Sequence, residues 1–392
     1  MSRSRQSRTT LPRVVIDLEK LRHINCGLGR FSLHLAQEML KAAAGRFEPV
    51  FFLPKGAEQY FPEGDFGRIE VAGWKKEGVR RFARPFAQPF LPKPTIALWH
   101  ATHQATKYLP FDVRIPVLLT IHDLNFLHES PTAGRTWEIT RKRNGVQRLV
   151  NRAAAIVTDS TYVAEEARGC LDLGKRPLHV VPLGLSAPPP PSVTRPAYIP
   201  EGPFLLTVGN FLVHKNFHVL LEFVARVPAT RLVIAGKNST QYGRFIKAEI
   251  ARLGLGDRVI LPGEVSDGDR QWLYENCEAF FFPSLAEGFG FPVLEAMQCG
   301  KPVFMSRKTS LPEIAGSCGF FFDSFEAGEM VKVFVAGRER FLKDPALADA
   351  CRLHANAFSW QVTARRYADV YESVLRSMTL PRSAGADTPA VR

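Results

Sequence analysis

The stretch SLAEGFGFPVLEAMQCGKPV, residues 284–303, follows the apolar run AFFF and contains two glutamates, Glu287 and Glu295, with seven residues between them. A short apolar strand that ends in a glycine-containing loop and leads into a helix is typical of one repeating unit of a parallel α/β sheet. Pro292 suits the first turn of such a helix, and Gly300 suits its end. Glu287 is therefore expected in the loop and Glu295 about one turn into the helix, where the two carboxylates face different parts of one elongated ligand.

Short β-branched or aromatic runs alternate with segments of helical periodicity along the rest of the chain. The runs expected to be strands are RVVIDLE, PVFFLP, RIEVAG, TIALWHA, PVLLTIHD and AAIVTDS, and then FLLTVGN, RLVIAGK, RVILPGE, AFFFPS, PVFMS and GFFFD. Such alternation is typical of parallel sheets covered by helices. The expected fold class is α/β, with two doubly wound, Rossmann-like domains that face each other across a cleft.

The length and the proline distribution predict the domain boundaries. The 392 residues exceed what one hydrophobic core usually organises, and 45% of them are apolar. The prolines of residues 185–203 predict a stiff linker. The domains are expected at residues 1–190 and 204–360, followed by a helix at about 361–378 and a disordered tail at 379–392.

Charge and cysteine content favour a cytoplasmic protein with an anionic partner. Residues 1–200 hold 29 Lys or Arg against 17 Asp or Glu, whereas residues 201–392 hold 22 against 21. The first half is therefore expected to bind the anionic partner. The six cysteines show neither a C-x-x-C pair nor zinc spacing. The N-terminus lacks the apolar core of a secretory signal, and no run reaches the roughly 18 apolar residues of a spanning helix.

Two loops of the first half are candidates for the cleft. Gly27 and Gly29 come between a strand and a helix expected to start near Arg30, where free N–H groups and the helix dipole favour a phosphate. A turn that only requires glycine is the alternative reading. His122 and Asp123 end a buried strand, where a histidine can hydrogen-bond a sugar hydroxyl or a phosphate. The alternatives are a packing histidine and an aspartate that caps the following turn.

Two loops of the second half carry charged candidates. Asn210, His214 and Lys215 follow a strand, and Lys215 is expected early in a helix, where a cation is favourable only if an anion lies beside it. A solvated surface lysine is the alternative. The glycines next to Glu287 allow close approach to a ligand, and the carboxylate of Glu295 can accept hydrogen bonds from two neighbouring hydroxyls, such as those of a ribose. Glu295 can also be read as an acid favoured by the helix dipole.

The ordered set GLGRF, TIHD, VGNFLVHKN, LVIAG, VILPGEV, FPSLAEGFGFPVLEAM, SLPEIAG and the late FSW resembles retaining nucleotide-sugar glycosyltransferases of the GT-B fold, in the large family 4 or group 1 that includes bacterial mannosyltransferases and sucrose synthases. The resemblance covers nearly the whole chain. It implies that Glu287 lies beside the transferred sugar, with His122 near it, and that Glu295 holds the ribose. It also implies that Lys215 binds the diphosphate and that Gly29 faces it.

The resemblance implies further donor-binding positions and the course of the last helix. The other donor-binding residues that it implies are Gly27, Asn210, His214, Gly288, Phe289 and Gly290. Many members carry Arg at the position of His214, so one fixed charge on the diphosphate is replaced by a titratable group. The helix after FSW is expected to pack back on the first domain.

No metal or other cofactor is expected. Asp267 and Asp269 form one D-x-D sequence, which is interpreted as the cap of the helix RQWLYEN. The charge of the leaving diphosphate would then be met by Lys215, helix N-termini and loop amides. The sequence leaves open whether Glu287 is a covalent nucleophile or supports attack from the same face.

The expected acceptor surface lies on the first domain. Residues 74–94 and 135–152 combine cations with aromatic side chains, which suits an anionic bilayer or a lipid-linked glycan. A solvated basic face is the alternative, and nucleic acid is disfavoured because recognition motifs are absent.

Together these features predict a retaining, metal-independent hexosyltransferase of bacterial cell-envelope polysaccharide or lipopolysaccharide biosynthesis. Its donor would be a nucleotide-diphospho-sugar, with GDP-mannose as the first candidate, and its acceptor a glycan or lipid-linked glycan. It would lie in the cytoplasm, or peripherally at the inner face of the cytoplasmic membrane. An epimerase or phosphorylase of the same architecture and a non-catalytic glycan-binding protein are the alternatives.

Overall fold

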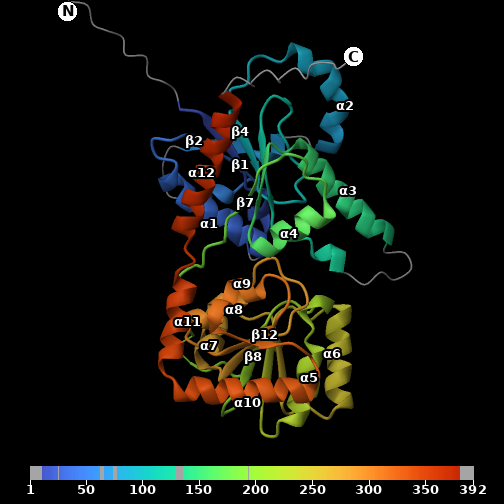
Figure 1. The fold of residues 1–392 in the computed structure, drawn as a ribbon, viewed down its shortest axis with the longest axis vertical. Helices are drawn as coiled ribbons and strands as arrows, with labels where there is room; N and C mark the ends of the chain where they lie inside the picture. The colour runs from blue at the N-terminus through green and yellow to red at the C-terminus, as the bar shows by residue number, and fades with distance from the viewer. Residues whose placement is uncertain are drawn as a thin grey trace, which may run out of the picture.

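The computed structural model describes residues 11–379 apart from 25, 62–65, 74–76, 129–135 and 193, and of residues 73, 77–81 and 379 it describes the main chain alone. The expected disordered tail beyond Thr379 lies outside the described residues. Within them the chain forms two sheets, each with helices around it, one above the other in Figure 1. All neighbouring strands run parallel. The expected α/β class with two doubly wound sheets is confirmed.

The first sheet, which defines the first domain, has seven strands in the order β3-β2-β1-β4-β5-β6-β7. Its strands are β1 (Arg13–Asp17), β2 (Glu48–Leu53), β3 (Gly67–Glu70), β4 (Leu98–Ala101), β5 (Val117–Ile121), β6 (Ala155–Thr158) and β7 (Leu178–Val180). The second sheet, which defines the second domain, has six strands in the order β10-β9-β8-β11-β12-β13. Its strands are β8 (Leu205–Val208), β9 (Leu232–Ala235), β10 (Val259–Gly263), β11 (Ala279–Phe282), β12 (Val303–Ser306) and β13 (Gly319–Phe322).

Helices follow most of the strands. The α-helices of the first half are α1 (Gly27–Ala42), α2 (Glu77–Ala87), α3 (Thr136–Arg152) and α4 (Thr161–Cys170). Those of the second half are α5 (His218–Arg226), α6 (Gln241–Arg252), α7 (Asp267–Asn276), α8 (Phe291–Gln298), α9 (Leu311–Ala315), α10 (Ala327–Lys343), α11 (Ala346–Asn356) and α12 (Trp360–Thr379). Short 3₁₀ turns are η1 (Glu19–His23), η2 (Ala57–Tyr60), η3 (Val71–Gly73), η4 (Gln88–Phe90), η5 (Asn125–His128), η6 (Val213–Lys215) and η7 (Gly316–Cys318).

The twelve runs read as strands are all strands in the structure, and one further strand, β7, escaped the sequence analysis. It has three residues, lies at the edge of its sheet and is flanked by prolines at 177 and 182. Short edge strands bury little side-chain area, so their sequences carry a weak apolar pattern.

Three helix starts differ from the prediction. Helix α1 starts at Gly27 and not near Arg30, because the thiol of Cys26 caps it by accepting from the Gly29 N–H at 3.4 Å. Lys215 lies in η6, ahead of α5, because Asn216 interrupts the helix with a left-handed φ of 58°. The cap of α7 is the Ser266 hydroxyl, which accepts from the N–H of Asp269 at 3.0 Å, so the D-x-D aspartates occupy the first turn.

The chain crosses between the domains twice, and the two crossings lie against each other. The Leu185 N–H donates to the Phe358 carbonyl at 2.9 Å, and Thr363 donates to the Pro182 carbonyl at 2.8 Å. Gly184 is required at this crossing, because an added Cβ would lie 2.2 Å from the main-chain nitrogen of Trp360. After the second crossing α12 runs along the first domain beside α1 (Figure 1).

Buried polar contacts fix α12 to the first sheet. The His100 ring, fully buried on β4, contacts the Tyr371 hydroxyl at 2.8 Å through Nδ1 and the Thr120 hydroxyl at 2.8 Å through Nε2. Tyr367 reaches the same Thr120 hydroxyl at 3.1 Å. Burial lowers the pKa of His100 to about 3, so the ring is neutral and serves as one donor and one acceptor. The C-terminal helix thus belongs to the core of the first domain.

The linker at residues 185–203 contains no helix or strand in its described part, and it docks on the second domain. The Ser192 N–H donates to the Gly268 carbonyl at 3.0 Å, and its hydroxyl donates to Asp269 at 2.6 Å. Ile199 is buried in the core. One hydrophobic cluster, which includes Phe31 of α1 and Met297 of α8, runs through both domains.

The close packing at this crossing leads to a testable prediction about Gly→Ala substitutions at two positions. Gly184→Ala should lower the melting temperature, because overpacking against Trp360 costs about 1–3 kcal/mol. Gly169→Ala, in α4, is the control: its Cβ would meet nothing within 4 Å, and alanine in a helix is worth up to about 1 kcal/mol over glycine. Differential scanning calorimetry measures both. Equal melting temperatures for the two variants would contradict the close packing of the two crossings.

Candidate active site

The loops that carry the predicted residues leave the carboxyl ends of the strands. The strand order reverses between β1 and β4 in the first sheet and between β8 and β11 in the second. Such switch points are where doubly wound sheets bind ligands. Gly27 and Gly29 follow β1, Lys215 follows β8 and Glu287 follows β11, so three of the four loops flank a switch point. His122 follows β5, one strand farther along.

Lys215 and Glu287 form an ion pair at the second switch point. The Lys215 Nζ lies 2.6 Å from Glu287 Oε1, and the two side chains are only 14% and 11% exposed. The Lys215 ammonium also lies 5.1 Å from the centre of the Phe282 ring, on β11. A pair this buried contributes little net stability, but it holds both charges in one geometry.

The main chain fixes both partners of this pair. The His214 carbonyl accepts from the Leu285 N–H at 2.7 Å and from the Ser284 hydroxyl at 3.1 Å, which ties η6 to the loop after β11. On the other side, the Glu287 N–H donates to the Thr309 hydroxyl at 3.2 Å. The two loops therefore form one rigid unit that presents a lysine and a carboxylate together.

Glu295 lies in the second turn of α8 and is partly exposed, as expected. Its Oε2 accepts from the Tyr274 hydroxyl at 2.8 Å, and its Oε1 lies 4.0 Å from the guanidinium of Arg30, which comes from the first domain. The same guanidinium binds Asp267 at 3.1 Å. Arg30 therefore bridges the two domains beside Glu295, a role that the sequence analysis did not assign to it.

His122 differs from the prediction, which placed its side chain in the cleft. The ring is buried, and both nitrogens are occupied: Nδ1 lies 2.6 Å from Asp159 Oδ2, and Nε2 lies 2.8 Å from the Thr102 carbonyl. Because a carbonyl can only accept, Nε2 carries a proton. Burial by itself would lower the pKa of His122, but Asp159 and the Thr102 carbonyl raise it above its ordinary value. The imidazole is thus a packing group, and only its main chain reaches the second domain.

The predicted glycines have different surroundings, and one of them, Gly288, lies at the contact between the domains. A Cβ at Gly288 would lie 2.0 Å from the His122 carbonyl oxygen, so this glycine allows the two domains to touch. Gly290 has a φ of 112° and starts α8, a conformation that favours glycine. Gly29 is confined by the His23 carbonyl, 2.3 Å from its added Cβ, whereas Gly27 has open space around it.

The remaining predicted residues are placed as follows. Phe289 is buried against Phe291 and Phe358, with ring centres 5.2 and 5.8 Å away, so its side chain belongs to the core and not to a donor pocket. Asn210 is exposed, and its side-chain oxygen accepts from the Lys237 N–H at 3.3 Å. Asp123 accepts from the Asn125 N–H at 3.1 Å and so caps η5, which was the alternative reading.

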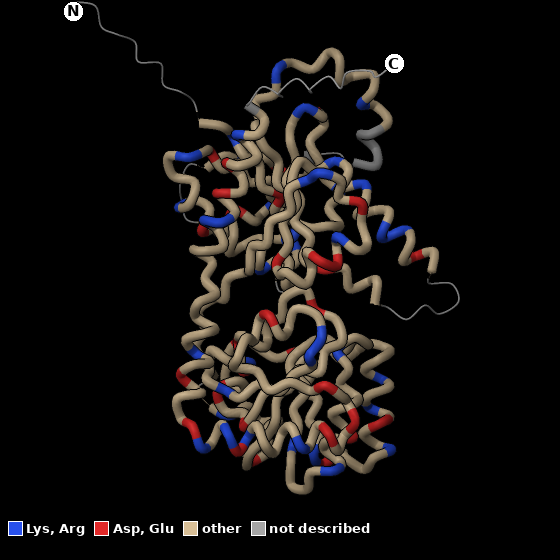
Figure 2. Tube along the Cα trace, in the orientation of Figure 1, with Lys and Arg blue, Asp and Glu red and all other residues tan. Residues whose placement is uncertain are grey.

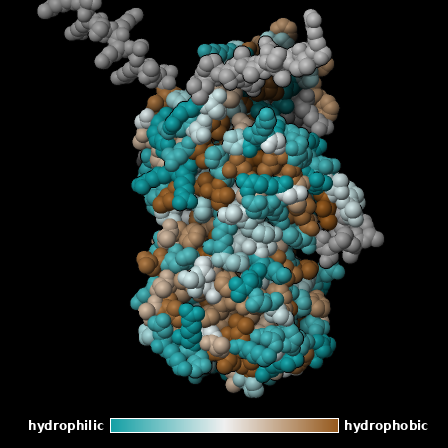
Figure 3. Space-filling model, in the orientation of Figure 1, coloured by the Kyte–Doolittle hydropathy of each residue, from teal (hydrophilic) through white to brown (hydrophobic). Residues whose placement is uncertain are grey.

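Further contacts hold the domains against each other. The Ser160 hydroxyl donates to the Gly288 carbonyl at 2.9 Å. The carboxylate of Glu313, from α9, accepts from the N–H groups of Thr161 and Tyr162 at 2.9 and 3.2 Å and so caps α4 from the other domain. On the face shown in Figure 3 the domains are in contact along the middle of the molecule.

Asp159 and Ser160 are site residues that the sequence analysis missed, although a signal was present. They end the strand run AAIVTDS in the same way that His122 and Asp123 end PVLLTIHD. Parallel strands bring such ends to one edge of the sheet. Glu313 gave no comparable signal, because its partners come from a distant segment.

Among the residues that the structure describes, no group of three or more His, Cys, Asp or Glu side chains could hold a metal ion. Within that same part of the chain, no helix combines the length and the apolar character that a membrane crossing requires.

Two doubly wound domains whose strand ends face each other, with charged groups converging from both, define the GT-B class. Residues 196–357 match the family described as Glycosyl transferases group 1. The match covers the second domain of this chain, and the resemblance inferred from the sequence is confirmed there.

Individual relatives support the same class. The chain is 51% identical over 126 residues to the O-antigen chain mannosyltransferase B of Escherichia coli, a match that covers 31% of this chain and 32% of the relative. It is 32% identical over 184 residues to the serotype-specific mannosyltransferase WbdA of Escherichia coli, covering 44% of this chain and 22% of the relative. The match thus spans between about a fifth and a third of the length of these relatives.

A solved structure shares the whole fold. The Anabaena protein HepE, in complex with UDP-glucose, superposes with a TM-score of 0.64 at 19% identity over 92% of this chain and 99% of that one. At this identity the likeness concerns the fold.

The buried His122–Asp159 pair predicts a pH-dependent effect. Asp159→Asn removes the charge that keeps the pKa of His122 raised, and it should destabilise the protein by about 1–3 kcal/mol at pH 6. Because His122 is protonated more readily in the folded than in the unfolded protein, its contribution is present below the ordinary pKa of about 6.5 and is lost as the pH rises through the raised pKa.

The melting temperatures of wild type and Asp159→Asn should therefore differ more at pH 6 than at pH 9. Asp257→Asn, an exposed aspartate of the second domain, is the control and should match wild type at both pH values. A gap between wild type and Asp159→Asn that widens with pH would contradict the assignment of a proton to this pair.

Proposed function

We propose that the chain is a glycosyltransferase that moves a hexose, with mannose as the first candidate, from a nucleotide-diphospho-sugar to a glycan or lipid-linked acceptor with retention. The observation that carries the proposal is the Lys215–Glu287 pair at the switch point of a group 1 glycosyltransferase domain. The similarity to mannosyltransferases, one of them named for the O-antigen chain, supports mannose and a role in O-antigen or similar envelope polysaccharide synthesis.

The proposed chemistry follows from the charges at this site. The bond between the anomeric carbon and the diphosphate breaks, and the leaving nucleoside diphosphate takes the electron pair. Lys215, the N-terminus of α8 and loop amides would stabilise that negative charge, as preorganised donors do in an oxyanion hole. The acceptor hydroxyl bonds to the anomeric carbon on the same face and gives its proton to the leaving phosphate.

Glu287 has two tasks in this proposal. In the free protein its carboxylate neutralises Lys215, so the lysine stays in place without a ligand. When the lysine binds a diphosphate in place of Glu287, the carboxylate stays beside the sugar. There it stabilises the positive charge of an oxocarbenium-like transition state. No metal or other cofactor takes part in the proposed reaction.

Glu295 would bind the ribose of the donor. Its carboxylate is partly exposed and is oriented by the Tyr274 hydroxyl, so an oxygen remains for a hydroxyl pair. Gly27 and Gly29 would face the diphosphate from the first domain, since a helix N-terminus favours an anion and Gly27 has open space around it.

The direct test is donor turnover by the purified protein. The protein is incubated with GDP-mannose, UDP-glucose and ADP-glucose in separate reactions, and the release of nucleoside diphosphate is followed. Turnover of one donor, with an α-linked product from an α-linked donor, is expected. Inversion of the anomeric centre would overturn retention, and interconversion of free sugars without transfer would favour the epimerase alternative.

Two single variants separate the parts of the donor site. Lys215→Ala should weaken the binding of a nucleoside diphosphate by about 1.5–3 kcal/mol, because a charge-assisted contact is lost. The binding of the nucleoside should be nearly unaffected. Glu295→Ala should weaken both ligands by a similar amount, about 1–3 kcal/mol. Isothermal titration calorimetry measures the four affinities. Equal losses on the nucleoside and the diphosphate for Lys215→Ala would contradict its phosphate role.

We also propose that α2 and η4 place the enzyme on an anionic membrane surface, at the inner face of the cytoplasmic membrane. Phe82, Phe86 and Phe90 are 68%, 80% and 86% exposed, and they recur at four-residue spacing. Exposed aromatic side chains beside basic residues suit the boundary between headgroups and acyl chains. Of residues 74–94, the side chains of Arg80 and Arg81 lie outside the described part.

Replacing these three phenylalanines by serine should abolish the flotation of the protein with phosphatidylglycerol vesicles, since each buried phenylalanine is worth on the order of 1–3 kcal/mol. The matched control replaces three exposed apolar residues of the second half, Val335, Leu342 and Leu353, by serine and should float like wild type. Wild-type protein that stays unbound at low salt, or a triple-phenylalanine variant that floats equally well, would contradict membrane docking.

A further inference from the structure

The first domain contains a cavity of about 890 Å³ that none of the proposed donor residues lines. It lies between α3 and the segment that follows β4, residues 104–109, and Arg84 of α2 closes one side. Figure 1 shows α2 and α3 on the same side of the first sheet.

The lining of the cavity is cationic, and the described residues that form it include no acidic side chain. Its positively charged residues are Arg84, Lys107, Arg141, Lys142, Arg148 and Arg152. Lys and Arg recur along α3 in Figure 2. Lys142 is paired with Glu138 at 3.2 Å, whereas Lys107, Arg141 and Arg148 form no ion pair within the described residues. Several like charges around one concave surface favour an anion strongly, because each would otherwise repel the others.

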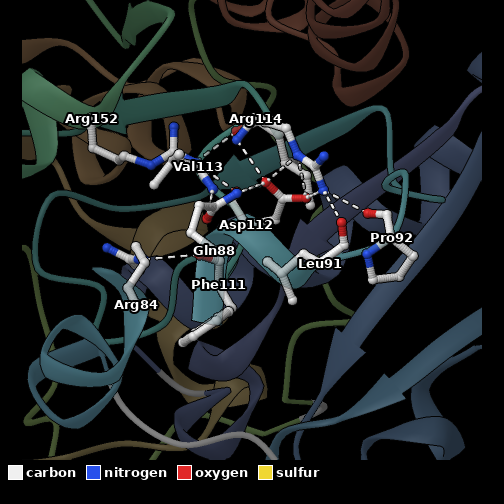
Figure 4. A network of polar contacts seen from close by, with 10 residues as sticks. Arg84, Gln88, Leu91, Pro92, Phe111, Asp112, Val113, Arg114 and Arg152 are labelled. Atoms are coloured by element: carbon white, nitrogen blue, oxygen red, sulfur yellow. Dashed lines mark hydrogen bonds and ion pairs between the residues drawn. The ribbon is translucent and has the colours of Figure 1, made fainter. Parts of the chain in front are cut away.

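Two of the arginines are fixed by main-chain carbonyls. Arg84 donates to the Phe111 carbonyl at 2.9 Å, and Arg152 donates to the Ile115 carbonyl at 2.7 Å. Figure 4 shows both beside the loop that holds Asp112. The Asp112 carboxylate does not compete for them, because it is bound by Arg114 at 2.7 Å, which holds its pKa at about 2. Two of the six cations of the cavity wall, Arg84 and Arg152, are therefore preorganised.

Much of the remaining lining is apolar, and one position in it is a glycine. Leu109, Phe126, Val146 and Leu149 contribute hydrocarbon surface. Gly145 lies in the middle of α3, where glycine costs about 1 kcal/mol relative to alanine. The fold does not require it, since an added Cβ would meet only the Arg148 guanidinium, at 3.9 Å. The missing side chain leaves room for an occupant instead.

The inner wall of the cavity is shared with the candidate active site. Gln104 lines the cavity, accepts from the His122 N–H at 3.2 Å and donates to the Asp123 carbonyl at 2.8 Å. The His122 carbonyl in turn meets Gly288, next to Glu287. The cavity is therefore connected to the proposed reaction centre through Gln104, His122 and Gly288.

We propose that this cavity binds the acceptor through a phosphate or diphosphate group that is joined to a hydrocarbon chain. The inference rests on the proposed glycosyltransferase function and names the class of its acceptor. Arg141, Arg148 and Lys107 bind the phosphate oxygens, and the apolar lining covers the first part of the chain. The chain leaves toward α2, whose exposed phenylalanines face the membrane in the proposal above.

The test uses the full chain with three probes: farnesyl diphosphate below its micelle-forming concentration, inorganic diphosphate and farnesol. Calorimetry should show farnesyl diphosphate binding at least about tenfold more tightly than either of the other two. Inorganic diphosphate that binds as tightly as farnesyl diphosphate would overturn the hydrocarbon part of the proposal, because the cavity would then hold a free phosphate compound. Farnesol that binds as tightly would overturn the phosphate part.

Two variants should block the cavity by different means. The double variant Arg141→Ala, Arg148→Ala removes phosphate contacts, and Gly145→Leu fills the space. Each should lower the affinity for farnesyl diphosphate by about tenfold or more. Gly145→Ala and Lys175→Ala are the matched controls, because the first leaves the cavity open and the second removes an exposed cation of the same domain that makes no contact within the described residues. Both controls should bind like wild type.

Nucleoside diphosphate titrations of the same variants separate this proposal from the function on which it rests. Unchanged nucleotide affinity shows that the variants are folded. A protein that turns over its donor but binds farnesyl diphosphate equally well with and without the cavity variants would overturn the acceptor site and leave the function standing. A protein that binds farnesyl diphosphate in the cavity yet never turns over a donor would overturn the acceptor role together with the function.

Discussion

The ion pair between Lys215 and Glu287 is the interaction on which the rest of the site depends. It joins the loop after β8 to the loop after β11, the two strands at the switch point of the second sheet. Removing either partner leaves a mostly buried charge without compensation, which is costly. The pair keeps a cation ready for a diphosphate and a carboxylate ready for a developing positive charge, and the ligand itself is what separates them.

The first domain completes the site through contacts that require a glycine on the second domain and a buried histidine on the first. Gly288 lets the His122 carbonyl approach, and Ser160 and Glu313 hold the same interface. The imidazole of His122 is used internally, paired with Asp159, so the first domain contributes main-chain groups and the N-terminus of α1 to the cleft. These polar contacts add to the hydrophobic cluster that runs through both domains.

Most of the fold could be predicted from the sequence, because parallel strands buried on both faces read as continuous apolar runs. The edge strand β7 could not, since its three residues bury little surface. The convergence of the site loops could be predicted as well, because loops that end strands at a switch point meet by topology. The ligand-binding roles of Lys215, Glu287 and Glu295 stay predictions. The Arg30 bridge and the Glu313 cap depend on the relative placement of the domains, which no local pattern contains. The Asp159 partner of His122 ends the neighbouring strand β6 of the same sheet, so the pattern of strand ends did carry a signal for it.

A crystal structure of the protein with its nucleotide-sugar donor tests the central claim most directly. The account predicts a diphosphate oxygen at hydrogen-bond distance, about 3 Å, from the Lys215 ammonium, with the Glu287 carboxylate beside the sugar and the ribose hydroxyls on Glu295. A donor bound elsewhere, with the Lys215–Glu287 pair intact and its 2.6 Å distance unchanged, would contradict it.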